Sequence, residues 1–211
     1  MNKLVISDLH LGRKFNKRKF DYLSRLFSRY PEIILNGDFW DYYSFSFDEF
    51  VNSKWNGLFP IMKKKTVYIY GNHDMKKWSD DRVKLFSKIH TSEYIKTIGA
   101  NKFIFRHGHV LDEFKQNESK KYVAFVRKLR LAYLGLVYDH LFTLLTLKNY
   151  KKIKKYSNNL VENELLVIGH KHAQLVNIKD KFISGGYIMF GKARYFELKN
   201  DGKIKLIKEK Y

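Results

Sequence analysis

The 211-residue sequence contains no cysteine and only two prolines. The absence of cysteine excludes disulfides and thiolate metal ligands, so any metal must be bound through nitrogen and oxygen atoms. Two prolines are too few to mark a linker, and neither an internal repeat nor a low-complexity stretch is present. Because 45% of the residues are hydrophobic, we expect one domain over residues 1–211 with a full core.

Acidic residues are also scarce, with 21 against 41 basic ones, which gives a formal net charge of +20. Such a charge attracts phosphate-rich substrates, nucleic acid or an acidic membrane surface. A general bias of the proteome toward lysine explains the total charge equally well. No secretory signal precedes the first strand-like run, so we expect a cytoplasmic protein, with peripheral contact to the inner face of the membrane as a further possibility.

Strand-like and helix-like segments alternate along most of the chain. Apolar runs predict strands at residues 3–7, 32–36, 66–70, 94–98, 103–105 and 165–168. Helical spacing predicts helices from the cap Asn16 to about Arg29, over 47–63, and after Ser79. Two hairpins are predicted near the C-terminus, with turns at 179–180 and 200–202. The alternation predicts an α/β fold, and the strand-rich end predicts a mixed sheet or a second sheet.

Five short polar motifs each follow one of these apolar runs. In chain order they are Asp8-Leu9-His10, Gly37-Asp38-Phe39-Trp40-Asp41, Gly71-Asn72-His73-Asp74, His107-Gly108-His109 and Gly169-His170-Lys171-His172. Any one of them is a common strand-to-turn sequence. Because a parallel sheet would bring the ends of the runs to one edge, all five in this order predict a metal site.

The donor types in these motifs suit two divalent cations. A carboxylate such as Asp38 can bridge two ions, and the neutral carbonyl oxygen of Asn72 limits the negative charge. Two ions about 3.5–4 Å apart can clamp a phosphoryl group and lower the pKa of a bridging water. Imidazole and carboxylate ligands suit manganese, iron, zinc or nickel, of which we expect manganese first.

On these motifs the chain resembles the calcineurin-like metallophosphoesterases, whose pattern is D-x-H, G-D-x-x-D, G-N-H-[D/E], H and G-H-x-H. The resemblance runs from Asp8 to His172 and implies a four-layer αββα sandwich of two mixed sheets. It implies hydrolysis of phosphoester or acid anhydride bonds, with His73 protonating the leaving oxygen and Asp41 orienting His73. The implied ligands are Asp8, His10, Asp38 and His172 for one metal, and Asp38, Asn72, His107 and His170 for the other.

Within that family, the chain looks like the UDP-2,3-diacylglucosamine pyrophosphatase group. Those enzymes carry a helical insertion between the fourth and fifth motifs that covers an acylated substrate. The resemblance therefore implies a nucleotide-linked lipid as substrate, with Asn72 and His73 among the residues that bind it. Two positions depart from the group, which commonly has G-N-R-D and H-G-D where this chain has His73 and His109. We expect His109 to contact phosphate or to support a ligand, and a structural role is an equal alternative.

Residues 112–160 contain no strand signal and predict a helical insertion, or lid. The apolar stretch 129–147 is short for a membrane span of about 20 residues, and a charged pair interrupts it. The insertion could pack on the core or on a twin subunit in a homodimer. It could also bury an acyl chain or dock on anionic lipid through the basic run 151–155. Lys120 and Arg127 could contact a diphosphate group of the substrate, or they could belong to a solvated helix face.

Three functions follow from this reading. The first is a dinuclear-metal phosphoesterase or pyrophosphatase that acts on a nucleotide-linked lipid. The second is a nuclease or nucleotide phosphodiesterase with the same chemistry, although no nucleic-acid-binding module is recognisable. The third is a non-catalytic scaffold, which the complete set of ligands disfavours.

Overall fold

The apolar runs form strands in a computed structural model that describes residues 2–109 and 152–211. The strands of the larger sheet are β1 (Lys3–Ile6), β2 (Glu32–Asn36), β3 (Thr66–Ile69), β4 (Ile89–Thr91), β10 (Tyr187–Met189), β11 (Lys192–Leu198) and β12 (Ile204–Lys210). Their order is β10-β11-β1-β2-β3-β4, and β12 pairs with β11. Strands β1 to β4 are mutually parallel, whereas β11 runs antiparallel to β1. The sheet is therefore mixed, as the sequence predicts.

A second mixed sheet contains β5 (Tyr94–Ile98), β6 (Asn101–Phe105), β7 (Glu164–Ile168), β8 (Gln174–Asn177) and β9 (Phe182–Gly185). Its order is β5-β6-β7-β9-β8. Strands β6, β7 and β9 are parallel, and the edge strands β5 and β8 are antiparallel to their neighbours. Both predicted C-terminal hairpins are present, as β8–β9 and β11–β12.

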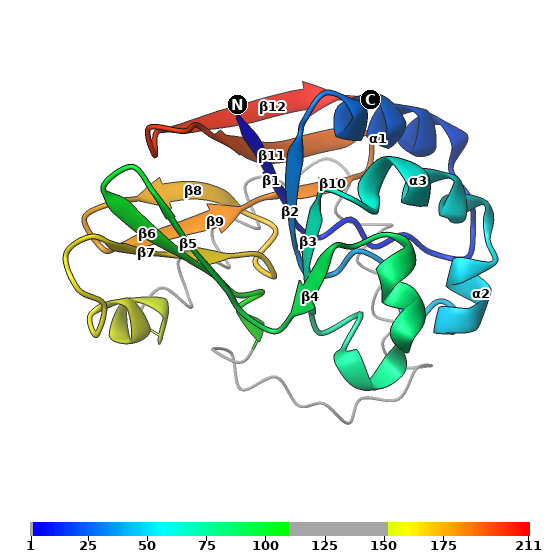
Figure 1. Ribbon diagram of the computed structural model, residues 1–211, viewed down its shortest axis with the longest axis horizontal. Coiled ribbons are helices and arrows are strands. Elements are labelled where there is room, and N and C mark those ends of the chain that lie inside the picture. Colours follow the sequence, from blue (N-terminus) through cyan, green and yellow to red (C-terminus); the bar gives the residue numbers. More distant parts are fainter. Residues whose placement is uncertain (1, 110–151) are drawn as a thin grey trace.

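Alternation of side chains along the strands produces separate apolar clusters between layers. Leu4 and Ile6 of β1 pack toward the helices, whereas Val5 between them packs against the second sheet. On the outer face of the second sheet, Leu166 packs with Ile153 of the helix at 152–157. Figure 1 shows the resulting order of helices, sheet, sheet and helix. The fold is the mixed α/β arrangement of two sheets that the sequence predicts.

The helices on the larger sheet follow the predictions in part. Helix α1 (Lys17–Ser28) is confirmed, and the Asn16 side chain caps it by accepting a hydrogen bond from the Lys19 amide. The predicted single helix over 47–63 is wrong. It is instead α2 (Phe47–Val51), the 3₁₀ helix η1 (Lys54–Leu58) and α3 (Phe59–Met62). The Ser53 side chain accepts a hydrogen bond from the Trp55 amide and so caps the start of η1. Because a new helix begins at this cap, α2 ends before it.

The predicted helix after Ser79 is instead a short 3₁₀ helix, η3 (Asp81–Leu85), which Asp80 caps. A second 3₁₀ helix, η2 (Lys76–Trp78), precedes Ser79. The predicted insertion over 112–160 lies outside the described residues except for 152–160, of which 152–157 are helical. Lys120 and Arg127 also lie outside them. Within the described parts of the chain, no helix has the length and apolar character needed to span a membrane.

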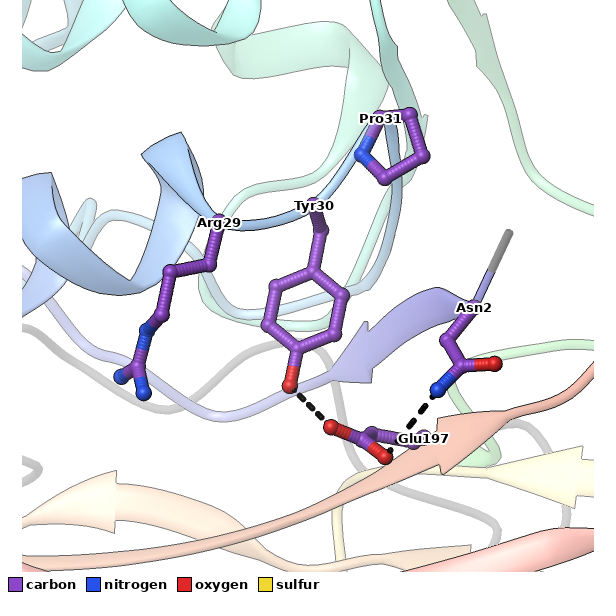
Figure 2. A pocket seen from close by; sticks show the side chains of 5 residues that line it. All are labelled: Asn2, Arg29, Tyr30, Pro31 and Glu197. Atoms are coloured by element: carbon purple, nitrogen blue, oxygen red, sulfur yellow. Dashed lines mark hydrogen bonds between the residues drawn. The ribbon is translucent and has the colours of Figure 1, made fainter.

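The amino ends of β1 and β2 border a hollow at the end of the larger sheet opposite to the polar motifs. There the Tyr30 hydroxyl donates to Glu197 of β11 at 2.5 Å, and the Asn2 amide donates to the same carboxylate at 3.4 Å (Figure 2). These bonds tie β11 to the start of the parallel strands. Because the motifs follow the carboxyl ends of the strands, this hollow is separate from the candidate metal centre.

Candidate metal centre

The five motifs meet where the carboxyl ends of strands from both sheets come together. Asp8, Asp38 and Asn72 follow β1, β2 and β3, whereas His107 and His170 follow β6 and β7 of the second sheet. The expectation of one parallel sheet edge is therefore corrected, because two sheets contribute the donors. The Asp38 carbonyl accepts from the amides of Leu9 and His10 at 2.9 Å, which joins the first two motifs.

The first group of donors contains Asp8, His10 and His172, whose ligand atoms lie within 4.8 Å of one another. The His172 Nε2 atom lies 3.1 Å from Asp8 Oδ1 and 3.2 Å from His10 Nε2. Asp8 is fully buried and also accepts a hydrogen bond from the His170 amide at 2.9 Å through Oδ2. This bond fixes the carboxylate with Oδ1 toward the histidines.

The second group contains Asp38, His107 and His170. The His107 Nε2 atom lies 3.2 Å from Asp38 Oδ2 and 3.1 Å from Asn72 Oδ1. The same Asp38 oxygen is 3.6 Å from His10 Nε2 in the first group. Asp38 therefore lies between the two groups, and its other oxygen is fixed by the His73 amide at 2.8 Å.

These donors fit divalent cations. In a shell with metal–ligand bonds of about 2.1 Å, neighbouring ligand atoms lie roughly 3.0–3.4 Å apart. The Asp8–His172, His10–His172 and Asp38–His107 separations, at 3.1, 3.2 and 3.2 Å, match that spacing. In addition, the buried Asp8 Oδ1 accepts no hydrogen bond from any described residue. A buried carboxylate oxygen of this kind is energetically costly unless a cation binds it.

The tautomer of His107 is set by the backbone. Its Nδ1 donates to the Asn36 carbonyl at 2.8 Å, which turns Nε2 toward Asp38. Burial alone would lower the pKa of His107, but the Asp38 carboxylate outweighs burial and raises it to about 10. Burial alone would raise the pKa of Asp38, but His107 and His73 hold that pKa well below its ordinary value.

The backbone conformation of the donors is uncommon. Five of the seven candidate donors have positive φ, between 45° and 61°: Asp8, His10, Asp38, His170 and His172. Such conformations cost about 1–3 kcal/mol each for residues other than glycine, and they concentrate at functional sites. Gly71 permits the close approach of the motifs, because a Cβ atom there would lie 2.2 Å from Asp38 Oδ1.

Two supporting residues were missed by the sequence analysis. The Asp74 carboxylate accepts from the amides of Asp38, Phe39 and Gly71, at 3.1, 2.6 and 2.6 Å. Burial, with a contribution from Asp38, raises the pKa of Asp74 to about 6. The position of Asp74 at the end of the third motif is the sequence feature that could have indicated this role. Buried Lys19 of α1 donates to the Leu9 carbonyl, and nothing in its helical position indicated this contact.

His73 and Asp41 form a pair beside the donors. The His73 Nδ1 atom lies 2.9 Å from Asp41 Oδ1, and the His73 side chain is 18% exposed whereas Asp41 is fully buried. The His73 ring stands at 85° to that of His10, with centroids 4.5 Å apart. Because Nδ1 is hydrogen-bonded to Asp41, Nε2 is the ring nitrogen of His73 that can hydrogen-bond to a substrate.

The remaining predicted residue, His109, is half-buried at the edge of the site. Its ring centroid lies 5.7 Å from that of His107 and 6.4 Å from that of His170. It borders a pocket of about 480 Å³ whose lining residues come from the segments after β3, β4 and β6, from β7 and from the helix at 152–157: Tyr70, Gly71, Met75, Lys76, Ser92, Glu93, Arg106, His107, Gly108, His109, Tyr156 and Leu166. The pocket therefore adjoins the second group of donors.

Three solved structures resemble this fold. The phosphoesterase YfcE from E. coli has a TM-score of 0.50 and 15% identity, with 98% of each chain covered. A predicted phosphoesterase from Streptococcus pneumoniae has a TM-score of 0.44 and 14% identity, with 99% of this chain and 97% of that chain covered. Vacuolar protein sorting 29 from Cryptosporidium parvum has a TM-score of 0.45 and 15% identity, with 100% of this chain and 97% of that chain covered. Comparison with curated protein sequences finds no match.

Two mixed sheets carry aspartate, histidine and asparagine donors at their joined ends, an arrangement that could hold metal ions. The sequence profile of the calcineurin-like phosphoesterases matches residues 1–207, and the chain belongs to this family. It is therefore a hydrolase that acts on phosphoester bonds, as the resemblance implied.

Proposed function

We propose that the protein holds two divalent cations and hydrolyses a phosphoester or pyrophosphate bond in an amphiphilic substrate. The observation that carries this proposal is the position of Asp38 Oδ2, which lies 3.6 Å from His10 Nε2 and 3.2 Å from His107 Nε2. One carboxylate can thus serve two adjacent cation positions. Their ligands would be Asp8, His10, Asp38 and His172 for one, and Asp38, Asn72, His107 and His170 for the other, with manganese as the expected metal.

When bound, such cations polarise the phosphoryl group and lower the pKa of a water that they hold. The protein's own contribution is to position the substrate and to move a proton. His73 in its protonated form donates to the leaving oxygen, and the buried Asp41 carboxylate 2.9 Å away stabilises the imidazolium and fixes its orientation. Asn72 directs its carbonyl oxygen toward His107, which leaves its amide nitrogen to donate to a phosphate oxygen.

The pocket beside His107 supports an apolar group in the substrate. Tyr70, Met75, Tyr156 and Leu166 line it, together with the Arg106–Glu93 ion pair and the positive charge of Lys76. Pockets that bind small molecules combine apolar walls with a few polar groups in this way. A nucleotide-linked lipid such as UDP-2,3-diacylglucosamine fits this description and the net charge of +20. Cytoplasmic location, with peripheral contact to an anionic membrane, follows from that substrate.

The test is Asp38→Ala compared with Asp21→Ala, which removes an exposed carboxylate paired with Lys17 on α1. We expect Asp38→Ala to abolish hydrolysis in manganese buffer and to lower the bound metal from two ions per chain, measured by elemental analysis. Asp21→Ala should retain the hydrolytic activity and the two bound metal ions. Hydrolysis at the wild-type rate by Asp38→Ala would contradict the proposal.

A further inference from the structure

Three aromatic side chains gather beside His73 without belonging to the donor set. Tyr42 and Tyr43 directly follow Asp41, and Trp78 ends η2 after the third motif. The Tyr42 and Trp78 rings are stacked, with centroids 3.9 Å apart and an angle of 7°. Tyr43 packs edge-on against this pair, at 5.9 Å from Tyr42 and 5.8 Å from Trp78. All three are half-buried, so part of each side chain remains accessible.

The Tyr43 ring also contacts His73, with centroids 5.0 Å apart and an angle of 75°. The His73 ring also contacts His10 of the first donor group, with centroids 4.5 Å apart. The His73 ring therefore adjoins both the candidate metal ligands and the aromatic cluster. A group bound beside His73 can contact Tyr43.

The position of the leaving group follows from these contacts and from the proposed function, on which this inference rests. The phosphorus must lie at the donor groups, and the leaving oxygen must lie within hydrogen-bond reach of His73 to receive its proton. The rest of the leaving group then lies beside His73, where the Tyr43 ring is 5.0 Å away. Lys77 places its ammonium 5.4 Å from the centre of the Trp78 ring, which adds positive charge to this side.

We propose that Tyr43, supported by the Tyr42–Trp78 stack, is a platform on which a planar aromatic ring of the leaving group packs. The substrate class is a phosphoester or pyrophosphate whose leaving group carries a planar aromatic ring. Aromatic pairs contribute beyond the apolar area they bury. We therefore expect a planar ring to bind about 2- to 12-fold more tightly than a saturated ring of the same size.

The test compares benzylphosphonate with cyclohexylmethylphosphonate by calorimetry on the full chain loaded with Mn²⁺. In both probes a methylene group replaces the leaving oxygen, so neither is hydrolysed. The wild-type protein should prefer the benzyl compound, and Tyr43→Phe should keep that preference. Tyr43→Leu should reduce the preference for the benzyl compound to about onefold without weakening the binding of the cyclohexylmethyl compound. The control Phe190→Leu, which alters an exposed aromatic outside the cluster, should behave as wild type.

Equal affinity for the two probes in the wild-type protein overturns the platform but leaves the phosphoesterase proposal intact. A preference that survives Tyr43→Leu also overturns it, since another group must then select the ring. Failure of both probes to bind in the presence of Mn²⁺ contradicts the proposed metal centre and the platform together.

Discussion

Gly71→Ala should disable the candidate metal centre through a single methyl group. A Cβ atom at this position would lie 2.2 Å from Asp38 Oδ1 and 2.5 Å from the Asp38 amide nitrogen. An ordinary contact requires at least 3.4 Å, so Asp38 must move by about 1 Å, a displacement that can reduce activity roughly 100-fold. The forced contact should also lower the free energy of unfolding by about 1–3 kcal/mol. Gly71 lacks a positive φ, so the effect is steric.

The assay is kcat/KM for a phosphate ester in manganese buffer, together with metal content and urea unfolding. Gly12→Ala is the matched control, because its φ is also not positive and, among the described residues, its Cβ would meet only the Ser44 side chain, at 3.1 Å from Oγ. A side-chain hydroxyl can rotate away, so this variant should retain activity and metal. Wild-type activity and metal content in Gly71→Ala would refute the assigned position of Asp38 at the centre.

Three further predictions concern the acid, the metal affinity and the fold. Asp41→Asn should lower kcat about 10²- to 10⁴-fold for alkyl phosphates but much less for p-nitrophenyl phosphate, whose leaving group needs no proton; equal losses would assign Asp41 a structural role only. The His107 pKa, raised to about 10 by Asp38, means that a cation displaces a proton at neutral pH. The dissociation constant for Mn²⁺ should therefore fall roughly tenfold per pH unit as pH rises toward 10, and calorimetry in buffers of different ionisation enthalpy should show proton release; identical heats would count against it. Asn16→Ala should lower the free energy of unfolding by about 1 kcal/mol in urea because α1 loses its cap, whereas Asn16→Asp should not.

The strands were predictable, and the candidate donors could be named, because their signals are local. Short apolar runs at residues 3–7, 32–36 and 66–70 became β1, β2 and β3 with little change in bounds. The Asn16 cap was predictable for the same reason, since a cap depends on a few neighbouring residues. The donors could be named because each directly follows such a run.

The relations between segments far apart in the chain were not predictable from local signals. That His107 and His170 reach the site from a second sheet depends on how β6 and β7 pack. The break of the helix at 47–63 depends on the Ser53 cap, which competes with an otherwise continuous helical pattern. Strand β4 was missed because it has only three residues, none of them fully buried. The roles of Lys19 and Tyr43 depend on contacts that no spacing in the sequence encodes.

The centre takes donors from both sheets, and this bears on when the chain acquires metal. The His170 amide reaches Asp8 across 162 positions of sequence, and the last two candidate ligands are synthesised only after residue 169. A nascent chain that has completed β1 to β3 holds donors from one sheet alone, with the second sheet still to form. High affinity should therefore arise late, after both sheets have folded and packed. Metal uptake would then report completed folding, and a chain arrested before β7 would be both inactive and poor at competing for metal ions in the cell.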